Sequence, residues 1–291
     1  MKNFIKCFFL AALLGSVEIF SFLNHELCLL KEQKGEFFLS DVVLSFALGA
    51  PQITTDSLIR MLLYMMPVFL FQILFGTIIY QRFCTASVYY FSREANRIHW
   101  FLKQILFLLS LSFFYLFTIL LVGTSICSRL YLIHTNITSF ILIFYFLSIH
   151  SLWLFLTTLA INLISIKAGS NIAFSIIGGV QLLCISSLIL WKDIFPLENT
   201  SHFEIHGLLL QINPISHLIL SWHSSSLSNI QAAIQDFRLN ASYSQLFQID
   251  FDLNFSVLIF AILSIFLIIA GCRIVFFQEF IITNKETGGM I

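Results

Sequence analysis

The sequence has very few charged residues. Asp, Glu, Lys and Arg make up 10% of its 291 residues, whereas soluble globular domains carry about 25%. No internal repeat, low-complexity tract or soluble domain interrupts the chain. Instead, 58% of the residues are hydrophobic and 34 are phenylalanine. The composition therefore predicts a polytopic membrane protein.

Several motifs that would indicate an enzyme are absent from the sequence. There is no GxxxxGK[ST] phosphate loop, so we expect no cofactor in this chain and ATP with its Mg on a separate subunit. The six cysteines form no CxxC pair, and the string HFEIH at His202–His206 lacks the HExxH order, so no metal site is predicted. No apolar run carries the paired acids or the nucleophile–base set of a hydrolase. The net charge of zero gives no case for nucleic acid as a partner.

Six apolar runs reach the length of about 20 residues that crossing a bilayer requires. They cover residues 4–23, 61–80, 105–126, 140–166, 172–191 and 255–277, within one transmembrane domain over 1–291. We expect each run to be a helix, because backbone polar groups at bilayer depth must be satisfied internally. The first run begins like a signal peptide, but it has no small-residue cleavage site, so we expect it to be retained. Pro67 permits a kink in the second run, and Gly178-Gly179 permits a bend or a close helix contact in the fifth.

The placement of Lys and Arg predicts that both termini are cytoplasmic. In that orientation the inner segments carry nine Lys and Arg against three acids, whereas the outer loops carry six against eleven. Basic residues near membrane spans favour the cytoplasmic side. The predicted fold class is thus an all-α membrane protein with six transmembrane helices. Cys28 and Cys127 both fall on the outer side, where a disulfide between them remains an alternative to two free thiols.

The last outer loop, residues 192–254, is predicted to be helical. Asn213 and Pro214 are typical of a helix start. Four apolar residues then recur at i, i+3, i+4 and i+7 and define one helical face: Ile215, Leu218, Ile219 and Trp222. A second helix is expected where the pattern repeats, at Leu227, Ile230, Ile234 and Phe237. We interpret the two helices as a lid on the membrane surface, with an ordinary structured loop as the alternative.

The segment 81–104, between the second and third runs, is basic and rich in aromatic residues. It contains Arg82, Arg93, Arg97 and Lys103, with Glu94 as its one acid. Its aromatic residues are of the types that favour the bilayer interface. One interpretation is a short helix that lies along the membrane and docks onto a partner. The other is a basic loop that only sets the topology.

The whole arrangement of apolar runs and loops resembles the permeases of type-2 ABC exporters. A local resemblance lies in the inner segment, which is similar to that of small permeases in bacteriocin and lantibiotic export or immunity systems. The residues that carry it are Tyr90-Phe91-Ser92-Arg93, Arg97, Trp100-Phe101 and Lys103. The resemblance implies a multi-pass protein of the bacterial cytoplasmic membrane. It implies that the segment 81–104 couples to a separate ATPase and that the outer helices cap the exit path. The coupling residues it implies are Tyr90, Phe91, Arg93, Glu94, Arg97 and Trp100.

Polar residues inside the apolar runs are candidates for a substrate path, because such residues are costly in hydrocarbon. Glu18, His150 and Gln181 lie in the first, fourth and fifth runs. Glu18 can equally reach the outer interface, and His150 and Gln181 can equally form hydrogen bonds between helices. Gln72 and Asn162 lie in the second and fourth runs.

We therefore expect a transmembrane subunit of an ATP-driven exporter, without catalytic residues of its own. The Phe-rich interior suits an amphipathic substrate such as a peptide or a lipid. The expected partners are a separate ABC ATPase, a second permease or a second copy of the chain, and membrane lipid. The alternative is a non-transporting immunity or sensor protein that binds a peptide at its outer loop and needs no ATPase.

Overall fold

The computed structural model describes residues 2–18, 38–47, 61–62, 64–89, 96–189, 210–240 and 251–277. Five helical segments in these ranges are long and apolar enough to cross a membrane: Met66–Thr85, Arg97–Leu130, Ile137–Ala168, Ser170–Leu188 and Leu253–Phe277. The prediction of an all-α, multi-pass membrane protein is therefore confirmed. The count of six spans is unconfirmed: the structure describes the first predicted span only as far as the end of α1 (Lys2–Glu18), and the apolar part of this described helix, Ile5–Val17, is shorter than a span.

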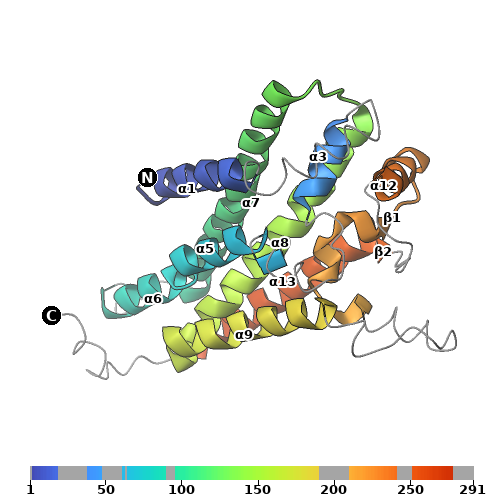
Figure 1. The fold of residues 1–291 in the computed structure, drawn as a ribbon. Coiled ribbons are helices and arrows are strands. Elements are labelled where there is room, and N and C mark those ends of the chain that lie inside the picture. The colour runs from blue at the N-terminus through green and yellow to red at the C-terminus, as the bar shows by residue number, and fades with distance from the viewer. Residues whose placement is uncertain are drawn as a thin grey trace, which may run out of the picture.

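Helix α8 (Ile137–Ala168) runs through the middle of the fold (Figure 1). Helices α7 (Arg97–Leu130), α9 (Ser170–Ile189) and α13 (Leu253–Phe277) pack against it. At 1.5 Å per residue, the 32 residues of α8 span about 48 Å, well beyond the hydrocarbon core of about 30 Å. A single residue, Gly169, joins α8 to α9, and its φ of 89° lies in the left-handed region that glycine adopts readily.

Helix α1 crosses α7 and packs closely on it (Figure 1). Cys7, Ala11 and Gly15 recur every four residues, so they share one face of α1, and Cys7 and Ala11 are buried. A Cβ atom added to Gly15 would lie 2.7 Å from the carbonyl oxygen of Ile119 on α7. The absence of a side chain at Gly15 thus lets the two backbones approach, as small residues commonly do in membrane helix pairs.

The second predicted span consists of two helices, α5 (Met66–Phe75) and α6 (Ile78–Tyr89), which are interrupted at Gly76 and Thr77. Pro67 lies in the first turn of α5, where its missing N–H group costs no hydrogen bond, so the interruption is not a proline kink. A Cβ atom at Gly76 would lie 2.9 Å from the ring of Phe174 on α9. Close packing at the interruption therefore favours glycine.

Asn162 of α8 bonds to the backbone at this interruption. Its side-chain oxygen accepts hydrogen bonds from the N–H groups of Ile79 at 2.8 Å and Tyr80 at 3.3 Å. Its amide nitrogen donates to the carbonyl oxygen of Phe75 at 3.1 Å. A helix can be broken at membrane depth only where neighbouring groups satisfy the freed backbone. One buried side chain meets that requirement here, which accounts for a polar residue within an apolar helix.

The four predicted lid residues, Ile215, Leu218, Ile219 and Trp222, are buried, but the prediction that they form one helical face is wrong. The chain forms two short 3₁₀ turns instead, η4 (Ser216–Leu218) and η5 (Leu220–Trp222). The polar residues within these turns, Ser216, His217 and Ser221, are also at most 2% exposed. No face of this segment is left for water, so its conformation follows from internal hydrogen bonds rather than from amphipathic periodicity.

The second predicted outer helix is present as α12 (Ser228–Asn240), with Ile230, Ile234 and Phe237 buried. Before it, the short strand β1 (His223–Ser224) pairs in parallel with β2 (Phe251–Asp252) at the start of α13. Helix α12 also contacts α3 (Leu39–Phe46), which is buried against α8 and α7. The described part of the region between the fifth and sixth predicted spans, residues 210–240 and 251–254, is therefore packed onto the helical bundle.

Candidate binding cavity

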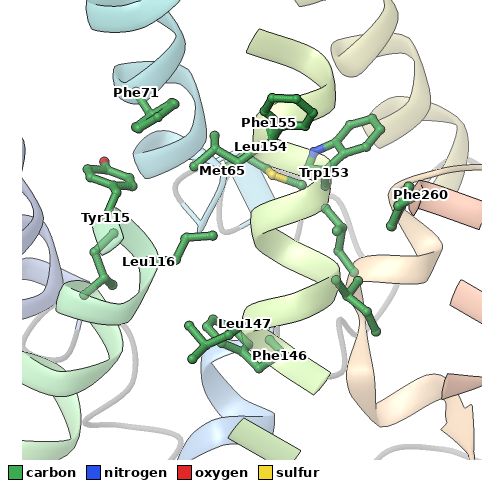
Figure 2. Packing of buried hydrophobic residues seen from close by; sticks show 14 of the residues in the cluster. Met65, Phe71, Tyr115, Leu116, Phe146, Leu147, Trp153, Leu154, Phe155 and Phe260 are labelled. Atoms are coloured by element: carbon green, nitrogen blue, oxygen red, sulfur yellow. The ribbon is translucent and has the colours of Figure 1, made fainter. Parts of the chain in front are cut away.

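A cavity of about 450 Å³ lies between α8, α9, α13 and the segment 210–217. This volume falls in the range of about 300–1,000 Å³ that is usual for small-molecule sites. Its walls are mainly apolar, with Leu156 from α8, Val180 from α9 and Phe260 from α13. Figure 2 shows the indole of Trp153 directed from α8 toward Phe260, and the two ring centroids lie 5.5 Å apart. The cavity is thus a lipophilic space lined by three membrane helices and one outer segment, and it is open on the side where Val180 and Ile212 are exposed.

Gln181 brings an amide group to the cavity wall. It lies on the stripe of α9 that includes Ala173, Ile177 and Ile185, and helical periodicity turns this stripe toward α8. The residue is 3% exposed, and neither its amide oxygen nor its amide nitrogen has a hydrogen-bond partner. Leaving a buried polar group unpaired costs about 1–3 kcal/mol. An amide that bears this cost inside a cavity is a candidate ligand contact.

Trp153 adds a second unpaired group, because this residue also lines the cavity and its buried indole N–H has no acceptor. Thr157, one turn further along α8, also lines the cavity, but its hydroxyl is bonded. That hydroxyl accepts a hydrogen bond from the side chain of Gln72 at 2.9 Å and donates to the carbonyl oxygen of Trp153 at 3.0 Å. Gln72 and Gln181 are equally buried, at 3% each. Burial alone therefore does not explain why Gln181 lacks a partner.

A histidine–serine–histidine cluster fixes the outer segment beside the cavity. Ser256, near the start of α13, lies 2.8 Å from Nδ1 of His217 and 2.8 Å from Nε2 of His223. The second ring nitrogen of each histidine donates to a backbone carbonyl oxygen, that of Gln211 for His217 and that of Ile219 for His223. Carbonyl oxygens only accept hydrogen bonds, so these contacts set the tautomer of each neutral ring and leave its other nitrogen as an acceptor that faces Ser256. The hydroxyl of Ser256 has one hydrogen, so it donates to only one of the two neutral rings at a time.

Burial favours the neutral form of both histidines. Desolvation lowers the pKa of His217 below its usual value of 6.5, and it lowers the pKa of His223 to about 3, against the opposing effect of the hydrogen bond to Ile219. The positive charge that His217 or His150 would acquire lowers the pKa of His223 further. The cluster therefore holds the outer segment as a neutral hydrogen-bonded unit at pH 7.

A serine within hydrogen-bond distance of a histidine also has the spacing of a nucleophile and its base. Ser256 is fully buried, however, and it does not line the cavity. Neither His217 nor His223 is oriented by a carboxylate, because each uses its other nitrogen for a backbone carbonyl. The arrangement thus fits a structural clasp better than a hydrolytic site.

Of the three residues predicted for the substrate path, Gln181 lines the cavity. His150 lies on α8 but does not line it. Its Nδ1 lies 3.0 Å from the carbonyl oxygen of Phe146 on the same helix, and its ring stacks on Phe146 at 4.2 Å. Glu18 is the last residue of α1, and its side chain lies outside the described residues. The structure therefore brings one of the three to the cavity.

The predicted coupling segment is described only in part. Tyr90, Phe91, Arg93 and Glu94 lie outside the described residues, whereas Arg97 and Trp100 lie in the first turns of α7. Residues 81–89 continue α6, and 97–104 begin α7, so these parts belong to the long helices and not to a separate short helix along the membrane.

The described ends of this segment contact each other. Arg82 donates a hydrogen bond to Gln104 at 2.6 Å, and its guanidinium group lies 4.7 Å from the ring centroid of Phe107. The ring centroids of Phe83 and Trp100 lie 5.9 Å apart. The end of α6 is thus attached to the start of α7.

Trp153, Thr157 and His217 were not identified from the sequence as cavity residues. Trp153 and Thr157 are ordinary members of an apolar run. His217 is 39 residues from Ser256, so no local pattern connects them. The one signal in the sequence for the histidine–serine–histidine cluster was the presence of two histidines six residues apart in the outer loop, His217 and His223. Cys127, considered for a disulfide with Cys28, is buried in α7, and Cys28 lies outside the described residues.

Comparison with protein-family models, with characterised proteins and with solved structures found no match to this chain.

Proposed function

We propose that the chain is the transmembrane subunit of an ATP-driven exporter in a bacterial cytoplasmic membrane, and that it moves an amphipathic molecule through the cavity between α8, α9 and α13. A separate ATPase, carrying ATP and Mg, supplies the energy at the segment 81–104. A second permease or a second copy of the chain completes the path. The observation that carries this proposal is a continuous set of contacts that links this segment to the cavity wall.

The first part of this set of contacts joins the segment 81–104 to the long helices. Helix α7 has 34 residues and spans about 51 Å, which leaves about 21 Å beyond a hydrocarbon core of about 30 Å. The bond between Arg82 and Gln104 and the contact between Phe83 and Trp100 hold the ends of α6 and α7 together. A force on the joined ends of α6 and α7 would therefore move both helices.

The second part joins α5 and α6 to the cavity. The interruption at Gly76 allows α6 to change its angle to α5, and Asn162 attaches the interruption to α8. Gln72 of α5 attaches to Thr157, which lines the cavity. Motion of α6 would thus reach the cavity wall through two buried polar side chains. Such a contact path supports coupling but needs a functional test.

The test uses two arginines at opposite ends of α7. We expect Arg97→Gln to reduce the amount of ATPase that co-purifies with the tagged chain from native membranes, together with the ATPase activity recovered. Arg129→Gln, in the last turn of the same helix, is the matched control and should leave both unchanged. Equal recovery with the two variants would overturn the assignment of the coupling segment.

The same experiment addresses the competing function. Wild-type chain that purifies without any ATPase, from cells that it protects against an antimicrobial peptide, would overturn the exporter proposal. That result would favour the immunity or sensor protein, which acts by binding alone.

A further inference from the structure

The described residues contain five buried side-chain atoms without a hydrogen-bond partner, and three of them belong to two residues that line the cavity. These three are both amide atoms of Gln181 and Nε1 of Trp153; the other two are Nε2 of His150 and Oγ of Ser264. Elsewhere in the bundle, buried polar side chains such as Gln72 and Asn162 are paired. Buried polar groups in proteins are paired in the large majority of cases, so a group of exceptions in one cavity indicates a ligand.

The three atoms define the hydrogen-bonding groups that a ligand must have. The amide oxygen of Gln181 needs a donor, whereas its amide nitrogen and the indole nitrogen of Trp153 both need acceptors. A secondary amide offers an N–H donor and a carbonyl acceptor with two lone pairs. A carboxylate or an ester offers only acceptors, and an ammonium group offers only donors. A secondary amide therefore meets all three requirements with one group, as does a hydroxyl group with its single donor and two lone pairs.

The cavity wall also determines the charge of the ligand. No Lys, Arg, Asp or Glu is among the residues that line it. A charge placed there without a partner would pay a desolvation cost of several kcal/mol. Leu156, Val180 and Phe260 offer apolar contact on three sides. The cavity thus fits an uncharged polar group on an apolar body and disfavours phosphate and carboxylate headgroups.

We propose that the cavity binds an uncharged group that both donates and accepts hydrogen bonds, such as a secondary amide, on an apolar body, held by Gln181 and Trp153. This inference rests on the proposed function, since it names the chemical class of the transported molecule. Two sources share this chemistry, the backbone of an apolar peptide and an amide-linked lipid. The lining residues act by hydrogen bonding and shape, and no covalent step is involved.

The test measures binding of three radiolabelled probes to the purified full-length chain in lipid nanodiscs. The probes are N-benzylhexanamide, the ester benzyl hexanoate and the ammonium N-benzylhexylamine, which share nearly the same apolar body. We expect the amide to bind about tenfold or more tightly than the other two, the change that one lost hydrogen bond of about 1.4 kcal/mol produces. Equal binding of the three probes would overturn the proposal.

Two variants and one spectroscopic signal locate the site. Gln181→Leu and Trp153→Phe should each weaken amide binding about tenfold, whereas Gln231→Leu, the same change at a paired glutamine on α12 that does not line the cavity, should leave it unchanged. The indole N–H resonance of Trp153, assigned by its loss in Trp153→Phe, should move when the amide binds. An unshifted resonance, or equal binding by Gln181→Leu and wild type, would overturn the assignment.

Competition identifies the source of the amide. Displacement of N-benzylhexanamide by N-acetyl-leucyl-phenylalaninamide would assign a peptide, and displacement by N-hexanoylsphingosine would assign a lipid. Displacement by neither would overturn the proposal for a natural ligand. These measurements need no ATPase. They can therefore fail while Arg97→Gln still releases the ATPase, which would reject the ligand class and leave the exporter proposal in place.

Discussion

Gln72 and Gln181 offer a matched test of the unpaired amide, because the same substitution should change stability in opposite directions. Both residues are 3% exposed on neighbours of α8, but Gln72 donates to Thr157 at 2.9 Å and Gln181 has no partner. Leucine is close to glutamine in size and removes all polar atoms from the side chain. The difference between the two variants therefore isolates the effect of the hydrogen bond.

The expected magnitudes follow from the contacts. Gln72→Leu removes one buried hydrogen bond, and such bonds between membrane helices contribute about 0.6 kcal/mol on average, so the free energy of unfolding should fall by about that amount. Gln181→Leu removes an unpaired amide whose burial costs about 1–3 kcal/mol, so the free energy of unfolding of the empty protein should rise by that amount. The two variants should thus differ by at least about 1.5 kcal/mol.

The assay is reversible unfolding of the purified, ligand-free chain in mixed micelles by titration with SDS, followed by circular dichroism. A double-mutant cycle of Gln72→Leu with Thr157→Val provides the control, and its coupling energy should equal the effect of the single hydrogen bond. If Gln181→Leu lowered the free energy of unfolding as much as Gln72→Leu does, Gln181 would have a partner in the empty protein. The argument for a ligand at the cavity would then be refuted.

Three further predictions concern the frame around the cavity. Asn162→Ala should lower the free energy of unfolding by roughly 3 kcal/mol and speed hydrogen exchange at the start of α6, since several backbone groups at the interruption lose their partner. Gly15→Ala should lower it by about 1–3 kcal/mol and weaken cross-linking between α1 and α7, because the new methyl group would lie 2.7 Å from the carbonyl oxygen of Ile119; unchanged cross-linking would contradict the packing. Burial lowers the pKa of His217 and of His223, so the unfolded chain binds protons below pH 6.5 that the folded chain does not. The free energy of opening of the outer segment, measured by hydrogen exchange, should be highest above pH 6.5 and fall by about 1.4 kcal/mol per pH unit below it for His223 alone. A constant free energy of opening down to pH 5 would refute the sign.

The sequence by itself determined the fold class and most of the helices. Long apolar runs must form helices in a membrane because their backbone groups have no other partners, and the runs at 105–126, 140–166 and 255–277 lie inside α7, α8 and α13. Helix α12 followed from the spacing of Leu227, Ile230, Ile234 and Phe237, of which the last three are buried. These features are local, since each depends on residues within a few turns of one another.

Only the tertiary structure decided how polar groups in different helices meet. The segment at Ile215–Trp222 has the spacing of an amphipathic helix, yet it forms two 3₁₀ turns because its polar side is enclosed and bonded to distant groups such as Ser256. Asn162 and Gln181 look alike in the sequence as polar residues within apolar runs. Packing pairs the first with the interruption before α6 and leaves the second unpaired at a cavity. Hydrogen-bond pairing depends on positions dozens of residues apart, which a periodic pattern along one segment does not encode.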